Sequence, residues 1–249
     1  NEALDVVLTQ NFQISAMSSP DLKHSRRAKA TPYDKGNMRL KLILDAAKEV
    51  FIDQGYNRIT LRNIALKAGI TVGNLNYYYK TKEDLLRDLL DMILKSYLDD
   101  FERVIAVGGE TPIERFESLV RYLIDDLNTT ETTKFFPELW ALSNHDEYAT
   151  QLMKRMYDVE REVLAGLIKE ANTKLTSDQV DQIALFVSSS IEGMTMFVGS
   201  NKSHEGSLES MKQIACRCFV TLLFDGSALT PANKKKNWHF PGSDFIKDK

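Results

Sequence analysis

The sequence predicts an all-α protein built from two unequal helical parts. Apolar residues recur at steps of three and four along most of its 249 residues, as on one face of an amphipathic helix. No segment alternates between apolar and polar residues for long enough to indicate a strand, and several helical segments follow a threonine that can cap them. With 43% hydrophobic residues the chain can bury a substantial core, as one large domain or two modest ones.

The first residues, up to about position 36, differ from those that follow. They show no sustained periodicity and contain scattered proline and glycine, so we expect a mostly disordered leader. A first helix is predicted from near Met38 and ends at Gln54-Gly55. Its apolar face comprises Leu40, Ile43, Leu44, Ala47, Val50 and Phe51.

Residues 60–85, TLRNIALKAGITVGNLNYYYKTKEDL, predict two short helices joined by a tight turn. Ala65 is small enough to let a second helix cross close above the first. Gly69 ends the first helix where a left-handed backbone is cheap only for glycine. Thr71 can cap the second helix, 72–79, by accepting a hydrogen bond from an amide near Asn74. This is the layout of a helix-turn-helix that reads DNA.

In the second of these helices Leu75 and Tyr79 lie four residues apart and are expected to face inward. The residues left facing outward or sideways are Gly73, Asn74, Asn76, Tyr77 and Tyr78. Amides can pair with adenine edges, and hydroxyls can reach phosphate oxygens. The alternative for the tyrosines is a packing cluster, which we expect for Tyr79 but not for all three.

On these residues the sequence closely resembles the TetR family of one-component transcriptional regulators. The resemblance is strong over residues 38–86 and rests on four motifs: Thr60-Leu61-Arg62-Asn63-Ile64-Ala65, the turn Ala68-Gly69-Ile70-Thr71, the tract from Gly73 to Tyr79, and Lys82-Glu83-Asp84-Leu85. The chain departs from the family at Asn76, where an aromatic residue is common, which bears on the operator sequence. The resemblance implies an N-terminal three-helix DNA-binding domain joined to a larger helical-bundle domain for ligand binding and dimerisation.

The distribution of charge along the chain agrees with an N-terminal DNA-binding domain. Residues 35–82 carry nine basic and three acidic side chains, a balance of +6 that leaves −9 for the rest of a chain whose net charge is −3. A small basic unit on an acidic body suits a docked reading domain better than a general polyanion binder. The base-reading candidates are Asn74, Asn76 and Tyr77. The further DNA-binding candidates, for phosphates or positioning, are Thr60, Arg62, Thr71, Val72, Gly73, Tyr78 and Lys82.

After the motif, Thr81 with Asp84 makes an approximate capping box for a long connector helix. Gly108-Gly109 breaks the chain before Thr111-Pro112, which with a glutamate at the third position starts another helix to about residue 127. Further helices are predicted over 134–143, 147–172, 177–198 and 208–224. The predicted organisation is a leader (1–36), a helix-turn-helix domain (37–84), an effector-binding and dimerisation body (85–225) and a tail (226–249).

The last two predicted helices carry more apolar surface than a terminal hairpin needs. The family resemblance implies that they pair with their mates across a two-fold axis, and the alternative is the core of a monomer. The resemblance also implies a small-molecule pocket in the body, which an aromatic and methionine lining would suit, although each such residue can equally be plain core. Candidate ligand-binding residues are Tyr122, Phe136, Trp140, His145, Met153, Tyr157, Met194 and Phe197.

Other classes of function find little support. The four histidines are scattered along the sequence, so we predict no catalytic site. Cys216 and Cys218 are expected on different sides of a helix, so we predict neither a metal site nor a cofactor. No run of 18 apolar residues and no secretory signal is present, which favours a cytoplasmic protein without a membrane partner.

We therefore expect a ligand-responsive, homodimeric regulator, a repressor released from palindromic double-stranded DNA by a small hydrophobic or aromatic effector. The alternative is a helical ligand-binding or interaction protein, or an enzyme, without DNA binding.

Overall fold

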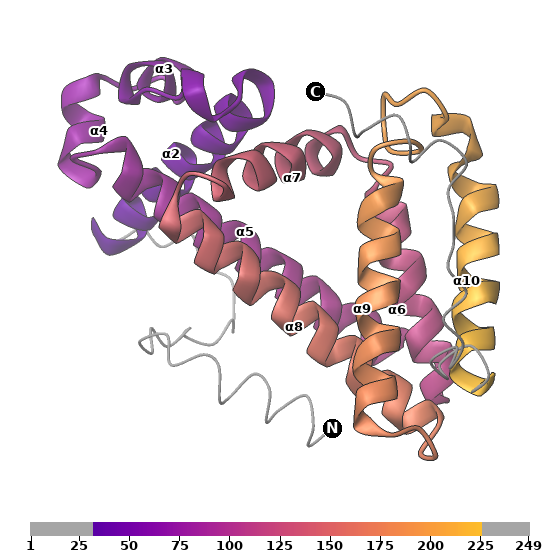
Figure 1. Ribbon diagram of the computed structural model, residues 1–249. Coiled ribbons are helices and arrows are strands. Elements are labelled where there is room, and N and C mark those ends of the chain that lie inside the picture. The colour runs from indigo at the N-terminus through magenta and orange to yellow at the C-terminus, as the bar shows by residue number, and fades with distance from the viewer. Residues whose placement is uncertain (1–31, 226–249) are drawn as a thin grey trace, which may run out of the picture.

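The computed structural model describes residues 32–225, and within this range the chain forms helices and no strand (Figure 1). The head consists of α2 (Pro32–Gln54), the 3-10 helix η1 (Tyr56–Arg58), α3 (Leu61–Lys67) and α4 (Val72–Tyr78). The body consists of α5 (Lys82–Val107), α6 (Pro112–Asp126), α7 (Thr130–Ser143), α8 (Glu147–Ala171), α9 (Ser177–Met194), the 3-10 helix η2 (Glu205–Ser207) and α10 (Leu208–Phe224).

Three helix boundaries differ from the prediction by more than one residue. The first helix begins at Pro32 rather than near Met38, because proline suits the first turn of a helix. Helix α7 begins at Thr130 rather than near residue 134, since the Thr129 side chain accepts a hydrogen bond from the Thr132 amide. Helix α9 ends at Met194 rather than near residue 198, because the next residues tighten into i to i−3 bonds after Gly193. The predicted tail and residues 1–31 of the leader lie outside the described residues.

The caps predicted at Thr71 and Thr81 form, and Thr60 caps α3 in the same way. The hydroxyls of Thr60, Thr71 and Thr81 each accept a hydrogen bond of 3.1 Å from the backbone amide three residues later. Gly69 adopts φ +64° in the turn. At Thr81 the Asp84 carboxylate accepts a hydrogen bond from the Thr81 hydroxyl rather than from the Thr81 amide. Only one of the two hydrogen bonds of a capping box therefore forms there, the one from the Asp84 amide to the Thr81 hydroxyl.

One continuous core runs from the head into the body. Figure 1 shows α5 and α8 side by side along the diagonal of the molecule, with the head at one end and α6, α9 and α10 at the other. Helix α6 packs between α5, α8 and α10, and α9 packs on α8. The capping box predicted at Thr111 is complete, because the Glu114 carboxylate accepts from the Thr111 amide at 2.9 Å and the Thr111 hydroxyl accepts from the Glu114 amide at 3.2 Å.

Helix α7 forms a second connection between body and head. Its Glu131 carboxylate is ion-paired with Lys48 of α2, and its Phe135 ring lies 5.2 Å from that of Phe51, also on α2. One turn further, Glu138 accepts a hydrogen bond of 3.2 Å from the backbone amide of Tyr56. The head is therefore held both by the covalent path into α5 and by one stripe of α7.

Candidate functional site

Helix α4 presents an exposed face on a buried support. Leu75 is fully buried and Tyr79 is nearly so, and the Tyr79 hydroxyl donates a 2.8 Å hydrogen bond to Asp88 of α5. Burial, together with this carboxylate, raises the pKa of Tyr79, so its hydroxyl stays protonated. Tyr77, by contrast, is 80% exposed. The inward and outward sides of this helix are thus those that the residue spacing predicts.

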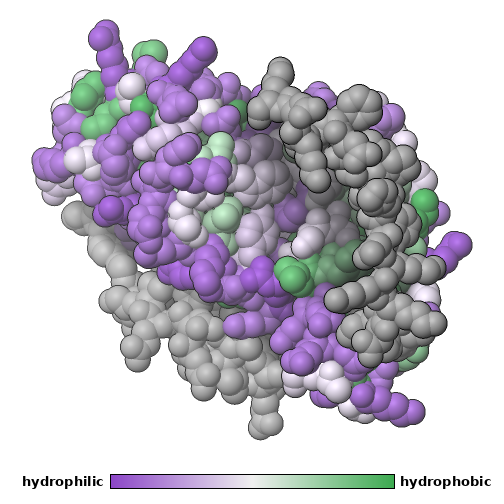
Figure 2. All heavy atoms as spheres, viewed as in Figure 1, coloured by the Kyte–Doolittle hydropathy of each residue, from purple (hydrophilic) through white to green (hydrophobic). Residues whose placement is uncertain are grey.

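Most of the predicted DNA-binding residues are exposed to solvent, on α4 and its cap or at the start of α3. The exposed ones are Thr60, Arg62, Thr71, Val72, Gly73, Asn74 and Tyr77, and the partly buried ones are Asn76, Tyr78 and Lys82. The Lys82 ammonium lies over the Tyr56 ring, 4.2 Å from its centroid, which fixes the start of α5 against η1. Hydrophilic side chains cover most of the head in the view of Figure 2. Lys80, absent from the candidates, is also exposed and donates to the Asn76 carbonyl at 2.8 Å.

An inner cavity lies at the centre of the body, with a volume of about 30 Å³. It is lined by Tyr97, Phe101, Leu123, Asp126, Leu127, Thr132, Phe136, Met156, Glu160, Ile191 and Glu192. Three of these residues are carboxylic acids, and none is basic. An apolar cavity with three acids and no base favours a positively charged guest over a neutral one.

Each of the three acids has hydroxyl partners. Asp126 accepts from Thr132 at 2.7 Å and from the Tyr97 hydroxyl at 3.0 Å. Glu160 is bonded to Ser188, and Glu192 to Tyr157. Burial nevertheless raises the pKa of all three carboxyls, and that of Glu192, which also faces the Glu160 charge, reaches about 8.

A groove of about 420 Å³ opens on the other side of Glu192, between α7, α8 and α9. Its wall carries Trp140, whose indole N–H donates a 2.8 Å hydrogen bond to the Tyr157 hydroxyl. Burial raises the pKa of Tyr157, so the hydroxyl is a neutral donor toward Glu192. Two aromatic rings and one buried carboxyl thus meet where the groove reaches the inner cavity.

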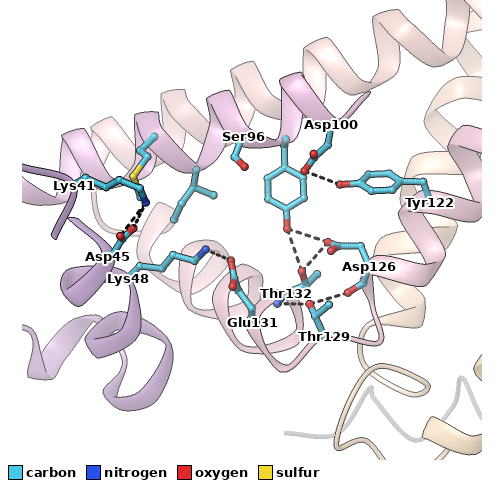
Figure 3. Close-up of a pocket in the computed structure, with 13 residues that line it drawn as sticks. Lys41, Asp45, Lys48, Ser96, Asp100, Tyr122, Asp126, Thr129, Glu131 and Thr132 are labelled. Carbon is cyan, nitrogen blue, oxygen red and sulfur yellow. Dashed lines mark hydrogen bonds and ion pairs between the residues drawn. The ribbon is translucent and has the colours of Figure 1, made fainter. Parts of the chain in front are cut away.

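A third hollow, a cleft of about 370 Å³, is lined by residues of α2 on one side and of α5, α6 and α7 on the others (Figure 3). Tyr97, Asp126 and Thr132 line both this cleft and the inner cavity, so a wall of three hydrogen-bonded side chains divides the two. Tyr122 reaches into the cleft from α6 and donates a 3.1 Å hydrogen bond to Asp100.

The predicted ligand-binding residues are divided among these hollows. Phe136 lines the inner cavity, Tyr122 the cleft, and Trp140, Met153 and Tyr157 the groove. The other three line none of these hollows: His145 and Phe197 are exposed, and Met194 packs against the core.

The sequence prediction omitted Tyr97, Asp126, Thr132 and Glu160. A usable signal existed for Glu160, which occupies an inward position of α8 with Met156 and Val163 on either side. Carboxylates at positions where the helical period demands apolar residues therefore indicate a polar cavity.

Helices α9 and α10 carry several large apolar side chains that are exposed to solvent. These are Leu185 and Phe186 on α9 and Ile214 and Phe224 on α10, with Met196 and Phe197 in the segment directly after α9. Cys216 is buried and Cys218 exposed, on different sides of α10 as predicted. Within residues 32–225 no helix is long and apolar enough to cross a membrane, and no group of His, Cys, Asp or Glu is arranged to hold a metal ion.

Comparisons with known proteins agree on one family. A family model described as bacterial regulatory proteins, tetR family, matches residues 43–89, and one described as BetI-type transcriptional repressor, C-terminal, matches residues 112–223. A HTH-type transcriptional regulator in the dhlA 5′ region of Xanthobacter autotrophicus is 28% identical over 133 residues, 53% of this chain and 66% of that one. The HTH-type transcriptional regulator BetI of Escherichia coli strain K12 is 23% identical over 164 residues, 64% of this chain and 80% of that one.

Among solved structures, a transcriptional regulator from Saccharomonospora viridis in complex with choline matches with a TM-score of 0.63 at 19% identity, over 75% of this chain and 96% of that one. That likeness shows a shared fold. The two family models cover the head and the body separately and agree with the exposed α4 face and the all-helical body. The chain belongs to the TetR family of DNA-binding transcriptional regulators, which are not enzymes.

Proposed function

We propose that this protein is a cytoplasmic, homodimeric repressor that leaves a palindromic operator when a small organic cation binds in its body. The observation that carries the proposal is the inner cavity, which lies between the helices that hold the head and contains three carboxylic acids without a base. Family membership already disfavours the alternative of a helical protein without DNA binding.

The head supports sequence reading through α4. Asn74, next to the capped N-terminus of α4, and Tyr77, one turn later, lie on its exposed side, while Leu75 and Tyr79 fix the helix from behind. Such a helix inserts into the major groove and contacts base edges with its outward side chains. We assign the phosphate contacts to the exposed Arg62 and the partly buried Lys82.

One such helix reads too few base pairs for useful specificity, so the proposed protein acts as a dimer. The exposed Leu185 and Phe186 of α9 and the exposed Ile214 and Phe224 of the neighbouring α10 support this, because large apolar side chains left in water favour burial against a partner. A two-fold axis beside these side chains would present two α4 helices to successive turns of the duplex, about 34 Å apart, and would require a palindromic operator.

The effector that we propose differs from the small hydrophobic or aromatic molecule expected from the sequence. Its body is apolar, but it carries a positive charge, because Trp140 and Tyr157 offer aromatic rings and Glu192 offers a carboxyl that a bound cation would ionise. The one base in this lining, Arg161, is already ion-paired with Asp158. Aromatic rings attract cations, and quaternary ammonium ions are the usual ligands of such sites. The choline in the Saccharomonospora viridis structure and the BetI-type body support this chemistry.

The size of the effector links its binding to movement of the heads. A cavity of about 30 Å³ holds only one or two water molecules, so a guest of the size of choline must enlarge it. Phe136 and Thr132, which line it, lie on α7, whose adjacent stripe contacts α2 and η1. Enlargement therefore shifts α7 and tilts α5, which changes the separation of the two heads. A differential affinity of about 1 to 3 kcal/mol would weaken operator binding about 5- to 150-fold.

The proposal is tested by fluorescence anisotropy with labelled DNA from upstream of the chain's own gene, at fixed salt. Choline is titrated into the complex, and its uncharged isostere 3,3-dimethylbutan-1-ol is the matched control. We expect release by choline only, and loss of release in Glu192→Gln without loss of DNA binding. Equal release by the neutral isostere would refute the charge argument, and no binding to any upstream fragment would refute the function.

A further inference from the structure

The cleft between the head and the body is a separate hollow from the groove in which Trp140 and Glu192 meet. Its volume of about 370 Å³ falls within the range of small-molecule sites. Figure 3 shows that α2 supplies one wall, with Lys41, Asp45 and Lys48, while α5, α6 and α7 supply the others. A molecule in this cleft would touch the head directly.

The cleft already holds an ammonium group that belongs to the chain. Lys48 extends from α2 toward α7, and its ammonium pairs with Glu131 (Figure 3). Its side chain is only 29% exposed, which is low for a lysine outside the core. The chain itself therefore shows that an ammonium on a flexible aliphatic stem can bind between these walls.

The remaining charges of the cleft are unbalanced. Its lining includes four carboxylates, Asp45, Asp100, Asp126 and Glu131, and two ammonium groups, so two negative charges exceed the positive ones. Lys41 pairs with Asp45, and Lys48 with Glu131. Within the lining, Asp100 accepts a hydrogen bond from the Tyr122 hydroxyl, and Asp126 accepts one from the Tyr97 hydroxyl. Arg103 pairs with Asp100 from the same helix, but its side chain is 75% exposed and such a pair contributes little.

Two tyrosines and two apolar residues complete the surface. Burial raises the pKa of Tyr122 to about 12 and raises that of Tyr97, so both hydroxyls stay neutral beside a carboxylate. Met92 and Ile93 of α5 provide an apolar strip in the same lining. Carboxylates with an apolar strip suit a ligand that has an ammonium group at each end and methylene groups between.

We propose that this cleft binds a small aliphatic diamine, with one ammonium between Asp100 and Asp126 and the other at Glu131 in place of Lys48. The bound diamine displaces the ion pair that joins α2 to α7. It thereby weakens one of the contacts that hold the head, from the other side of the Tyr97, Asp126 and Thr132 wall that the cleft shares with the inner cavity.

Isothermal titration of the full chain with 1,5-diaminopentane, without DNA and at low salt, tests this site. The diamine should bind, and the uncharged pentane-1,5-diol should not. Lys48→Met keeps the aliphatic stem and removes the competing charge, so it should bind the diamine at least fivefold more tightly. Asp126→Asn should bind it at least fivefold more weakly. If this variant does not fold, Asp100→Asn takes its place with the same expected result.

Two controls localise the binding. Lys154→Met removes an exposed ammonium of α8 that is ion-paired with Asp158, away from the cleft, and should leave the affinity unchanged. Glu192→Gln alters the inner cavity on the far side of the shared wall and should change the affinity much less than Asp126→Asn does. The proposal is overturned if the diamine does not bind, if the diol binds equally, if Lys48→Met fails to strengthen binding, or if Glu192→Gln weakens it as much as Asp126→Asn. Operator binding enters none of these measurements, so this site and the proposed function can fail separately.

Discussion

Replacing Glu192 with glutamine removes a carboxyl that the fold holds largely out of water. Burial, together with the Glu160 charge, raises its pKa from an ordinary 4.5 to about 8. The protonated carboxyl therefore favours the folded chain. This contribution is fully present below pH 4.5 and is lost as the pH rises through 8. Glutamine does not titrate, so the advantage of the variant should grow over this range and stay constant above it.

The size of the effect follows from the pKa difference. Each pKa unit corresponds to about 1.4 kcal/mol, so the interval from 4.5 to about 8 sets an upper limit of roughly 5 kcal/mol. Water reaches Glu192 from the groove and screens its charge, so we expect about 2 to 3 kcal/mol. For a domain of this size that corresponds to a rise in Tm of roughly 5 to 10 °C.

The assay is thermal unfolding followed by circular dichroism at pH 5.0 and pH 8.5. Glu192→Gln should unfold near the wild-type temperature at pH 5.0 and well above it at pH 8.5. Glu162→Gln, at an exposed position of the neighbouring α8, is the matched control and should show no pH-dependent difference. The reasoning is refuted if the Tm difference for Glu192→Gln is the same at both pH values or becomes negative at the higher one.

Three further predictions concern the head and the dimer face. Asn76→Ala should relax operator preference, whereas Lys82→Ala should weaken binding to all duplexes and reduce the salt slope by about one; equal effects in anisotropy titrations would contradict this division. Gly55→Ala should destabilise the fold by about 1 to 3 kcal/mol in urea unfolding, because φ is +73° and the new Cβ would lie 2.8 Å from Glu138 Oε2. Gly36→Ala, in open space within α2, should instead stabilise it by about 0.5 to 1 kcal/mol. Phe186→Glu should give monomers by light scattering while Val107→Glu, an exposed apolar site at the end of α5, should not.

Much of the head was predictable because its signals are local. A threonine cap depends on residues three positions apart, and the left-handed turn at Gly69 depends on one residue. The burial of Leu75 and Tyr79 follows from their spacing of four. The predicted boundaries failed where two local preferences competed, as at the start of α7, where the Thr129 cap outweighed the low helix propensity of the threonines that follow.

The ligand site was predicted less well because it depends on distances between helices. Aromatic residues and methionines indicate a pocket only weakly, and the structure distributes the eight candidates over three hollows and leaves His145, Met194 and Phe197 outside them. Asp126 and Glu192 are 66 positions apart in the sequence, yet they line one cavity. No periodicity within a single helix reveals such a pair.

The sequence by itself determined the helices of the head, the exposed face of α4 and the all-α class, since these follow from hydrogen bonds and apolar spacing within a few residues. Only the tertiary structure decided that α7 joins the body to the head and that three acids share a cavity without a base. The physical reason is that charge balance and burial are properties of the space between helices, and packing sets that space.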